Sequence, residues 1–267
     1  LAMKVILEQG GVGSAASSRF FDRFLEEAQV TGQLDHPGIV PVHELGVDSQ
    51  GRLYFTMPLV RGRDLAEIFK RVHAGDEEWR RVRALGVLLK VCESMAYAHD
   101  KGIVHRDLKP ANVMVGKYGE VYVMDWGLAH VKGREGRADS RLREMASLSL
   151  SEVRTDRDEA KQDASDAPLV TMAGMVVGTP YYMPPEQARG QIERIGPRSD
   201  VYAVGAMLYH LVTGRMPYSQ PGGQVSAHTV LAQVIHGRPT PIADLAPDVI
   251  ALQEADPISR YADRWRD

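Results

Sequence analysis

The spacing of hydrophobic positions changes along the chain from a strand pattern to a helix pattern. Apolar runs at residues 3–8, 40–47 and 52–60 predict three strands, and turn-forming residues at 48–51 join the last two. Between the first two runs, residues 18–34 carry apolar side chains mostly at helical spacing. We therefore expect the first part of the chain to be a small sheet with one helix.

Helical patterns dominate the remainder of the chain. Residues 78–101 predict a long helix that stops at Gly102, and residues 200–213 are apolar on almost every side, which predicts a buried helix. Short strands are expected at 113–115 and 120–124, around a turn. The long helix is expected to bury one apolar stripe. The members of this stripe are Leu85, Leu88, Leu89, Cys92, Met95 and Ala96.

One segment has a different composition. Residues 132–166 contain 17 charged side chains, several serines and no aromatic residue. Such a segment cannot bury enough apolar surface to offset the entropy of ordering, so residues 132–170 are expected to form a mobile insertion. The change from strands to helices near residues 61–63 predicts two lobes, residues 1–62 and residues 63–267.

Charge, hydrophobicity and cysteine content indicate which partners and which cellular compartment to expect. The net charge of −3 offers no basic surface for nucleic acid or lipid, and no apolar run is long enough to cross a membrane. The single cysteine, Cys92, excludes an internal disulfide and indicates a reducing compartment, so we expect a cytoplasmic location. Because the first residue is Leu1 and not Met, we expect a segment of a longer protein, whose membrane anchor, if it has one, lies outside this segment.

The strongest chemical signal is the stretch IVHRDLKPANVMV at residues 103–115. It places a carboxylate (Asp107), a cation (Lys109) and a carboxamide (Asn112) in one polar loop between the long helix and the predicted hairpin. Phosphoryl transfer requires such groups, to orient a hydroxyl, to neutralise the moving phosphoryl group and to hold Mg²⁺. Asp125 follows the hairpin, which can fold back and bring this second carboxylate beside Asn112.

In this order and spacing, the residues resemble the protein kinase family. Residues 105–112 match the catalytic loop of the family, and residues 125–127 match its DFG element with Trp in place of Phe. The resemblance implies an α+β, bilobal fold with a small, partly truncated β lobe and a larger, mainly helical lobe. It also implies that Asp107 is the catalytic base and that Lys109 contacts the γ-phosphate. Asn112 and Asp125 would then hold Mg²⁺.

The resemblance implies an ATP site as well. Ala2-Met3-Lys4 resembles the end of the VAIK element, which implies that Lys4 binds the α- and β-phosphates with Glu27 as its ion-pair partner. Met57 would be the gatekeeper of the segment that connects the lobes, where the adenine would contact Pro58 C=O and Val60 N–H. The nucleotide-binding set implied in this way is Lys4, Glu27, Met57, Pro58, Val60, Met114 and Asp125.

Other matches concern the protein substrate and its regulation. Gly178-Thr179-Pro180 resembles the substrate-side loop, and Asp200 resembles the residue that braces the catalytic loop. Arg260 is expected to pair with Glu186. Arg106 is placed to pair with a phosphate on the activation segment. The candidate acceptors of this phosphate are Ser147, Ser149, Ser151, Thr155, Ser165 and Thr171, with Thr171 preferred.

The chain also departs from the family pattern. The Gly-rich loop, which should precede Lys4, is absent, so we expect this segment to bind ATP poorly. Three glycines follow Lys4 instead and are interpreted as a flexible connection: Gly10, Gly11 and Gly13. Trp126 is expected to fill an apolar slot between the lobes, and His105 is expected to be a packed structural residue.

These features predict a serine/threonine protein kinase domain that uses ATP and Mg²⁺ and acts on a protein substrate, with no nucleic-acid partner. Lys109 and Thr179 favour this branch over tyrosine kinases. Two alternatives stay open at this point. One is a non-catalytic kinase-like binding module, which the missing Gly-rich loop favours, and the other is a small-molecule phosphotransferase of related fold.

Overall fold

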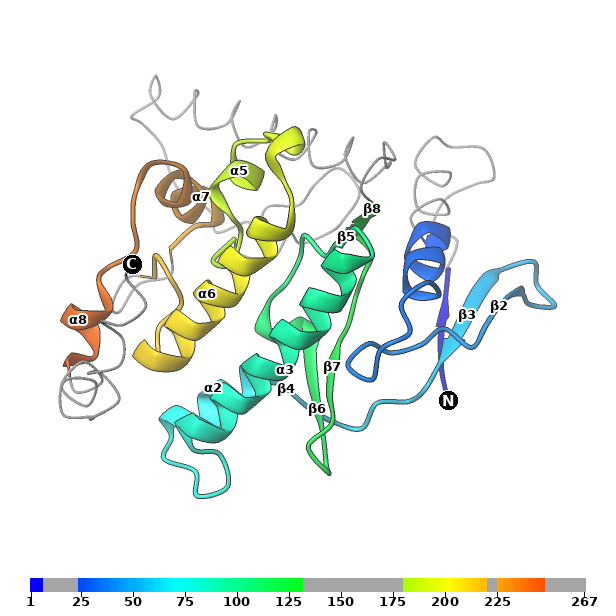
Figure 1. Ribbon diagram of the computed structural model, residues 1–267, viewed down its shortest axis with the longest axis horizontal. Coiled ribbons are helices and arrows are strands. Elements are labelled where there is room, and N and C mark those ends of the chain that lie inside the picture. The colour runs from blue at the N-terminus through cyan, green and yellow to red at the C-terminus, as the bar shows by residue number, and fades with distance from the viewer. Residues whose placement is uncertain (7–23, 132–179, 220–224, 248–267) are drawn as a thin grey trace, which may run out of the picture.

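The computed structural model describes residues 1–6, 24–131, 180–219 and 225–247. Strands near the N-terminus form a small part of the molecule, and the helices α2, α3 and α6 belong to a larger part beside it (Figure 1). This division agrees with the expected α+β, bilobal fold. Within the described ranges, no helix has the length and apolar character that crossing a membrane requires.

The smaller part is a three-stranded antiparallel sheet covered by one helix. Its strands are β1 (Ala2–Val5), β2 (Glu44–Val47) and β3 (Leu53–Met57), in the order β1-β3-β2. The covering helix includes residues 24–31. Phe24 from this helix packs on Phe55 of β3, with ring centroids 4.8 Å apart. The register pairs Lys4 with Phe55, which places the lysine on the edge strand β1, opposite the middle of β3.

A second small sheet carries the predicted hairpin. Strands β6 (Val113–Gly116) and β7 (Val121–Val123) pair antiparallel, as expected, and β4 (Gly62–Asp64) adds to the other edge of β6. Strand β5 (Ile103–Val104) pairs with β8 (His130–Val131). Because Gly62 already pairs with Gly116, the expected division after residue 62 falls inside β4.

Helices form the bulk of the larger part. The α-helices are α2 (Leu65–His73), α3 (Arg81–Asp100), α5 (Pro185–Ala188), α6 (Pro197–Thr213), α7 (Ala227–His236) and α8 (Ile242–Leu245). Two short 3₁₀ helices are η1 (Pro110–Asn112) and η2 (Ile192–Arg194). Asp64 caps α2 by accepting a hydrogen bond from the Glu67 N–H at 2.7 Å. Gly102 has a φ of 73° after the end of α3, which agrees with the stop predicted there.

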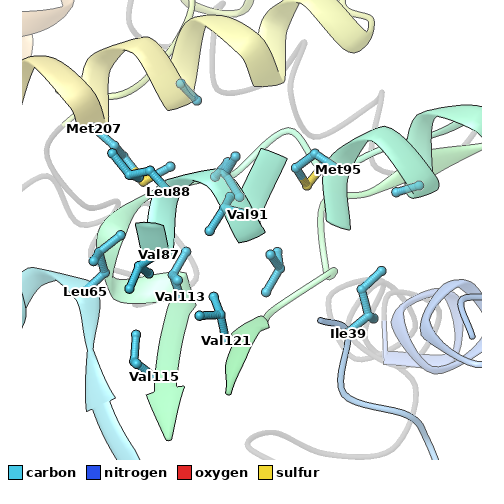
Figure 2. Close-up of a cluster of buried hydrophobic side chains, with 14 of the residues drawn as sticks. Ile39, Leu65, Val87, Leu88, Val91, Met95, Val113, Val115, Val121 and Met207 are labelled. Carbon is cyan, nitrogen blue, oxygen red and sulfur yellow. The ribbon is translucent and has the colours of Figure 1, made fainter. Parts of the chain in front are cut away.

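The main core lies where α2, α3, α6 and the β6–β7 hairpin meet (Figure 2). Leu65, Val91 and Met207 each expose none of their surface. Burying a side chain of this size stabilises the fold by about 1.5–3 kcal/mol. Ile39, from the loop after the first helix, joins the same cluster and forms a bridge with Val123. The core therefore connects the first part of the chain to the strand that leads to Asp125.

The expected apolar stripe of α3 is wrong in most of its members. Leu88 and Met95 are buried, but Leu85, Leu89, Cys92 and Ala96 are exposed. The buried face is instead formed by Ala84, Val87, Leu88, Val91, Ser94, Met95 and Ala98. Because α3 is apolar around much of its circumference, helical spacing permits two stripes, and packing against α6 and β7 selects one of them.

Three other expectations need correction. Helix α6 is not buried on all sides, because Val201 is 64% exposed and Leu208 is 39% exposed. The first helix ends at residue 31, before a turn at 32–33, and not at residue 34, while its expected start at residue 18 lies outside the described residues. The strand expected from residue 40 begins at Glu44, and Pro41, which has no N–H to give to a sheet, lies in the part that is not a strand.

Candidate active site

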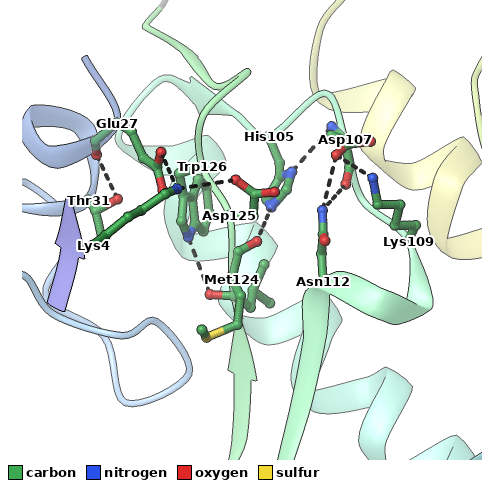
Figure 3. Close-up of polar contacts among 11 residues, drawn as sticks. Lys4, Glu27, Thr31, His105, Asp107, Lys109, Asn112, Met124, Asp125 and Trp126 are labelled. Carbon is green, nitrogen blue, oxygen red and sulfur yellow. Dashed lines mark hydrogen bonds and ion pairs between the residues drawn. The ribbon is translucent and has the colours of Figure 1, made fainter. Parts of the chain in front are cut away.

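The polar loop between β5 and β6 brings three of the predicted site residues together (Figure 3). Lys109 Nζ lies 2.7 Å from Asp107 Oδ2. Asn112 Nδ2 donates to the Asp107 backbone oxygen at 2.8 Å and to Asp107 Oδ2 at 3.1 Å. The turn at η1 makes these contacts possible, because it folds Asn112 back onto the start of the loop. A carboxylate, a cation and a carboxamide therefore share one small region.

The carboxylate of Asp200, at the start of α6, fixes the backbone of this loop. Its carboxylate accepts hydrogen bonds from His105 N at 2.9 Å and from Arg106 N at 3.0 Å, and it is 1% exposed. His99 Nε2 lies 2.7 Å from the same carboxylate. Arg106 has a φ of 68°, which a non-glycine residue adopts only when its surroundings hold it there. The structure thus gives Asp200 the bracing contacts that the resemblance implied.

His105 connects the loop to the strand that ends before Asp125. The Asp107 N–H donates to His105 Nδ1 at 3.2 Å, so the ring is protonated on Nε2, which donates to the Met124 oxygen at 3.0 Å. Trp126 packs against His105 with ring centroids 4.7 Å apart and is 3% exposed. Both residues are packed, as expected, and both belong to the framework that positions the two aspartates.

Asp125 faces the lysine of the small sheet. Lys4 Nζ lies 4.0 Å from Asp125 Oδ1 and 2.6 Å from Glu27 Oε1 (Figure 3). The Lys4–Glu27 pair implied by the resemblance is therefore present. Burial raises the pKa of Glu27 above its usual range, although the Lys4 ammonium acts in the opposite direction. Asp125 has a φ of 61°, and its side chain is 52% exposed, so it can reach a ligand from solvent.

Gly127 lies directly alongside these carboxylates. A Cβ atom at this position would lie 3.3 Å from Glu27 Oε2 and 3.4 Å from Asp125 Oδ1. The absence of a side chain therefore leaves room for the two acids to approach Lys4. This is a physical reason for glycine in the Asp-Trp-Gly element.

The donor set fits Mg²⁺ that is shared with a nucleotide. Within the described ranges, no three His, Cys, Asp or Glu side chains gather into a metal site of their own. The side chain of Asn112 donates its two hydrogen bonds to Asp107 through its nitrogen, so its carbonyl oxygen is the atom that a cation would take. Mg²⁺ prefers oxygen ligands and usually combines one or two protein oxygens with water and phosphate. Asn112 and Asp125 match that requirement.

The remaining sequence-predicted residues of the nucleotide site lie in strands or directly after one. Met57 ends β3 opposite Ala2, and residues 58–60 follow without regular structure. Met114 lies in β6 between Asp64 and Tyr122. Their contacts with a nucleotide stay predictions. Several expectations fall outside the described residues: Gly10, Gly11 and Gly13, the insertion at 132–170, the six candidate acceptors, Thr179 and Arg260.

Sequence reasoning missed contacts in the second half of the chain. Glu186 Oε1 accepts a hydrogen bond from Ser199 Oγ at 2.6 Å. Gln187 Nε2 donates to the Arg106 backbone oxygen at 3.0 Å. Tyr182 Oη lies 2.7 Å from His210 Nδ1. Burial, with a smaller effect of His73, lowers the pKa of His210 to about 4. The sequence predicts a different partner, Arg260, for Glu186, and the other side chains lack a distinctive motif, so only the fold brings them to notice.

Comparison with known proteins gives a consistent family match. A model described as the protein kinase domain matches residues 1–255. The chain is 37% identical to the serine/threonine-protein kinase PknD of Protochlamydia amoebophila over 74% of its own length and 19% of that protein. It is 34% identical to PknD of Chlamydia trachomatis over 89% of its length and 25% of that protein. It is 35% identical to the probable serine/threonine-protein kinase PknB of Corynebacterium glutamicum over 98% of its length and 36% of that protein.

Proposed function

This chain belongs to the protein kinase family, and we propose that it transfers the γ-phosphate of ATP to Ser or Thr hydroxyls of a protein substrate. The observation that carries the proposal is the loop in which Asp107, Lys109 and Asn112 contact one another. The chain spans 19 to 36% of the length of the relatives compared above. The activity, substrates and partners of the whole protein are therefore part of the proposal.

In the proposed reaction Asp107 orients the attacking hydroxyl and accepts its proton. Lys109, 2.7 Å from the Asp107 carboxylate, is placed to offset negative charge on the phosphoryl group as it moves. Little covalent chemistry is required of the protein, because positioning and electrostatic stabilisation supply most of the rate. The brace from Asp200 supports this role, since it fixes the backbone next to Asp107.

Binding of the nucleotide is proposed to involve the other side of the site. Lys4 would bind the α- and β-phosphates while Glu27 holds its ammonium in place. Asn112 and Asp125 would hold Mg²⁺, which when bound supplies positive charge to the phosphate oxygens. Residues 57–60 and Met114 would contact the adenine.

The proposal extends to organisation and partners. Residues 1–62 and 63–267 are proposed to act as the two lobes, with 132–170 as an activation-segment insertion and Thr171 as its preferred phosphorylation site. The partners are ATP and a protein substrate. Cys92 is a free thiol, which supports a reducing, cytoplasmic setting.

The relatives favour this function over a non-catalytic binding module, because each one compared above is named as a kinase. Transfer of labelled γ-phosphate from ATP tests the proposal, with the full-length protein and an Asp107→Asn control. We expect labelled phosphoserine or phosphothreonine in a protein acceptor. Label on tyrosine or on a small molecule alone, or equal labelling by the control, would contradict the proposed function.

A further inference from the structure

Gln187 makes a buried contact with the catalytic loop that neither the sequence motifs nor the proposed mechanism uses. It lies in α5, and its Nε2 donates to the Arg106 backbone oxygen at 3.0 Å. The residue is 6% exposed, so water competes little for this bond. The Arg106 oxygen belongs to the peptide bond that joins Arg106 to Asp107. The contact therefore acts on the backbone of the proposed catalytic base.

The same backbone is held from the opposite direction by Asp200. Its carboxylate binds the N–H of Arg106 at 3.0 Å, while Gln187 binds the C=O of the same residue. Arg106 has a φ of 68°, a left-handed conformation that is unfavourable for a non-glycine residue without support from its surroundings. Two side chains from different helices thus fix both polar groups of one strained residue.

The other half of the Gln187 amide makes no comparable contact. Its Oε1 is buried and has no hydrogen-bond partner among the residues that the structure describes. A buried acceptor without a partner is unfavourable, which reduces what the amide contributes to folding. A side chain of similar shape without polar atoms would avoid this cost but would lose the bond to Arg106. The amide is therefore better explained by its effect on the loop than by stability.

The position of Gln187 in the chain indicates which segment its hydrogen bond links to the catalytic loop. It follows Glu186, which is fixed by Ser199 on α6, and it comes shortly after the segment that the family resemblance assigns to the protein substrate. We propose that Gln187 is a positioning residue that ties this substrate-side segment to the orientation of Asp107. The inference rests on the proposed kinase function and concerns the same site.

The test replaces Gln187 by Met, which is similar in size and has no N–H donor, in the full-length protein. A second variant, Gln187→Leu, guards against a misfolded first one. We expect kcat to fall by about tenfold, the effect of losing one buried hydrogen bond that matters in the transition state. KM for ATP should stay within about twofold, because Lys4 and Asp125 are untouched, and the thermal midpoint should not fall.

Gln191→Leu is the matched control, since this amide lies in the same region and its Oε1 accepts from Arg194 instead. The control should keep the parent kcat. A second readout needs no activity: amide hydrogen exchange over residues 103–112 should be faster in both Gln187 variants than in the parent. Unchanged kcat and unchanged exchange would overturn the inference, as would kcat and thermal midpoint falling together in both variants. An inactive parent would contradict the proposed function instead, and the exchange result would still decide the role of Gln187.

Discussion

Among the residues that the structure describes, Lys109 and Asn112 contact the Asp107 side chain, and both do so through the same oxygen. Lys109 and Asn112 each bind Oδ2, at 2.7 and 3.1 Å. The other carboxylate oxygen, Oδ1, is therefore the atom best placed to accept a proton from a hydroxyl. One oxygen of the carboxylate is thus held by neighbouring side chains while the other can contact a substrate, which is compatible with the proposed role of Asp107 as a base.

Glu27 gives the site a dependence on pH. Its pKa is raised by burial, so it takes up a proton at a higher pH than an ordinary carboxyl group. Protonated Glu27 no longer attracts the Lys4 ammonium, 2.6 Å away. We therefore expect KM for ATP to rise as the pH falls, with a midpoint at a higher pH than the pKa of an ordinary glutamate. In Glu27→Gln, KM for ATP should be raised at all pH values and should lack this midpoint.

The neighbouring acid provides the control for that experiment. Glu26→Gln should keep the parent pH profile, because the lysine contacts are made by Glu27. If the Glu26 variant lost the midpoint and the Glu27 variant kept it, the assignment of the Lys4 partner would be wrong.

His210 makes the stability of the fold depend on pH. Its pKa is lowered by burial, whereas the pKa of Glu27 is raised. Burial lowers its pKa to about 4, so between about 6.5 and 4 the unfolded chain binds a proton that the folded chain does not. Stability is therefore complete above this window and is lost as the pH falls through it. His210→Gln should flatten that loss in urea denaturation curves recorded across the window. The exposed His236→Gln is the control and should leave the slope unchanged.

The residues that sequence alone identified are those whose spacing carries chemistry. Asp107, Lys109 and Asn112 lie within six positions, and a local loop is enough to bring them together. Lys4 and Glu27 are 23 positions apart, so their pairing followed only from the family resemblance. Gln187 was not identified, because a glutamine on a short helix has the same sequence signature whether it faces water or a catalytic loop.

At the scale of elements, β1, β3 and the β6–β7 hairpin were predictable, whereas the start of β2, the short strands β4, β5 and β8, and the buried faces of the helices were not. The β6–β7 hairpin is marked by turn residues between two short apolar runs, a local signal. The face that α3 buries depends on α6 and β7, which are distant in sequence. An amphipathic pattern decides a buried face only when the other face is polar, and on α3 it is not.

Alanine substitutions at two glycines test how closely neighbouring elements pack. A Cβ at Gly62 in β4 would lie 1.9 Å from the Val115 backbone oxygen, so β4 and β6 would have to separate. Gly62→Ala should therefore lower the free energy of unfolding by about 1–3 kcal/mol. Gly86, within α3, has nothing within 4 Å of its Cβ position. Gly86→Ala should instead raise it by roughly 0.5–1 kcal/mol, because alanine is the better helix former.

Urea denaturation of the two variants separates these effects. The opposite signs make the pair its own control, since both changes add one methyl group. A Gly62 variant as stable as the parent would mean that β4 does not pack on β6 as described.

At the scale of the whole molecule, the site is assembled from both parts of the chain. Lys4 and Glu27 come from the small sheet and its helix, whereas Asp107 and Asn112 come from the loop between β5 and β6 (Figure 3). Asp125 lies between these groups, 4.0 Å from Lys4 and joined to the loop through Met124 and His105. None of these groups alone would indicate a chemical function. Their common location is what supports the proposed phosphoryl transfer.

The most direct test of this account is the rate of γ-phosphate transfer in Asp107→Asn, measured together with ATP binding in the full-length protein. If Asp107 orients the hydroxyl and the nucleotide is held by Lys4, Asn112 and Asp125, transfer should fall by at least about a hundredfold, the usual scale for losing a general base. The dissociation constant for ATP should change by no more than about twofold. Transfer at the parent rate in this variant would contradict the account.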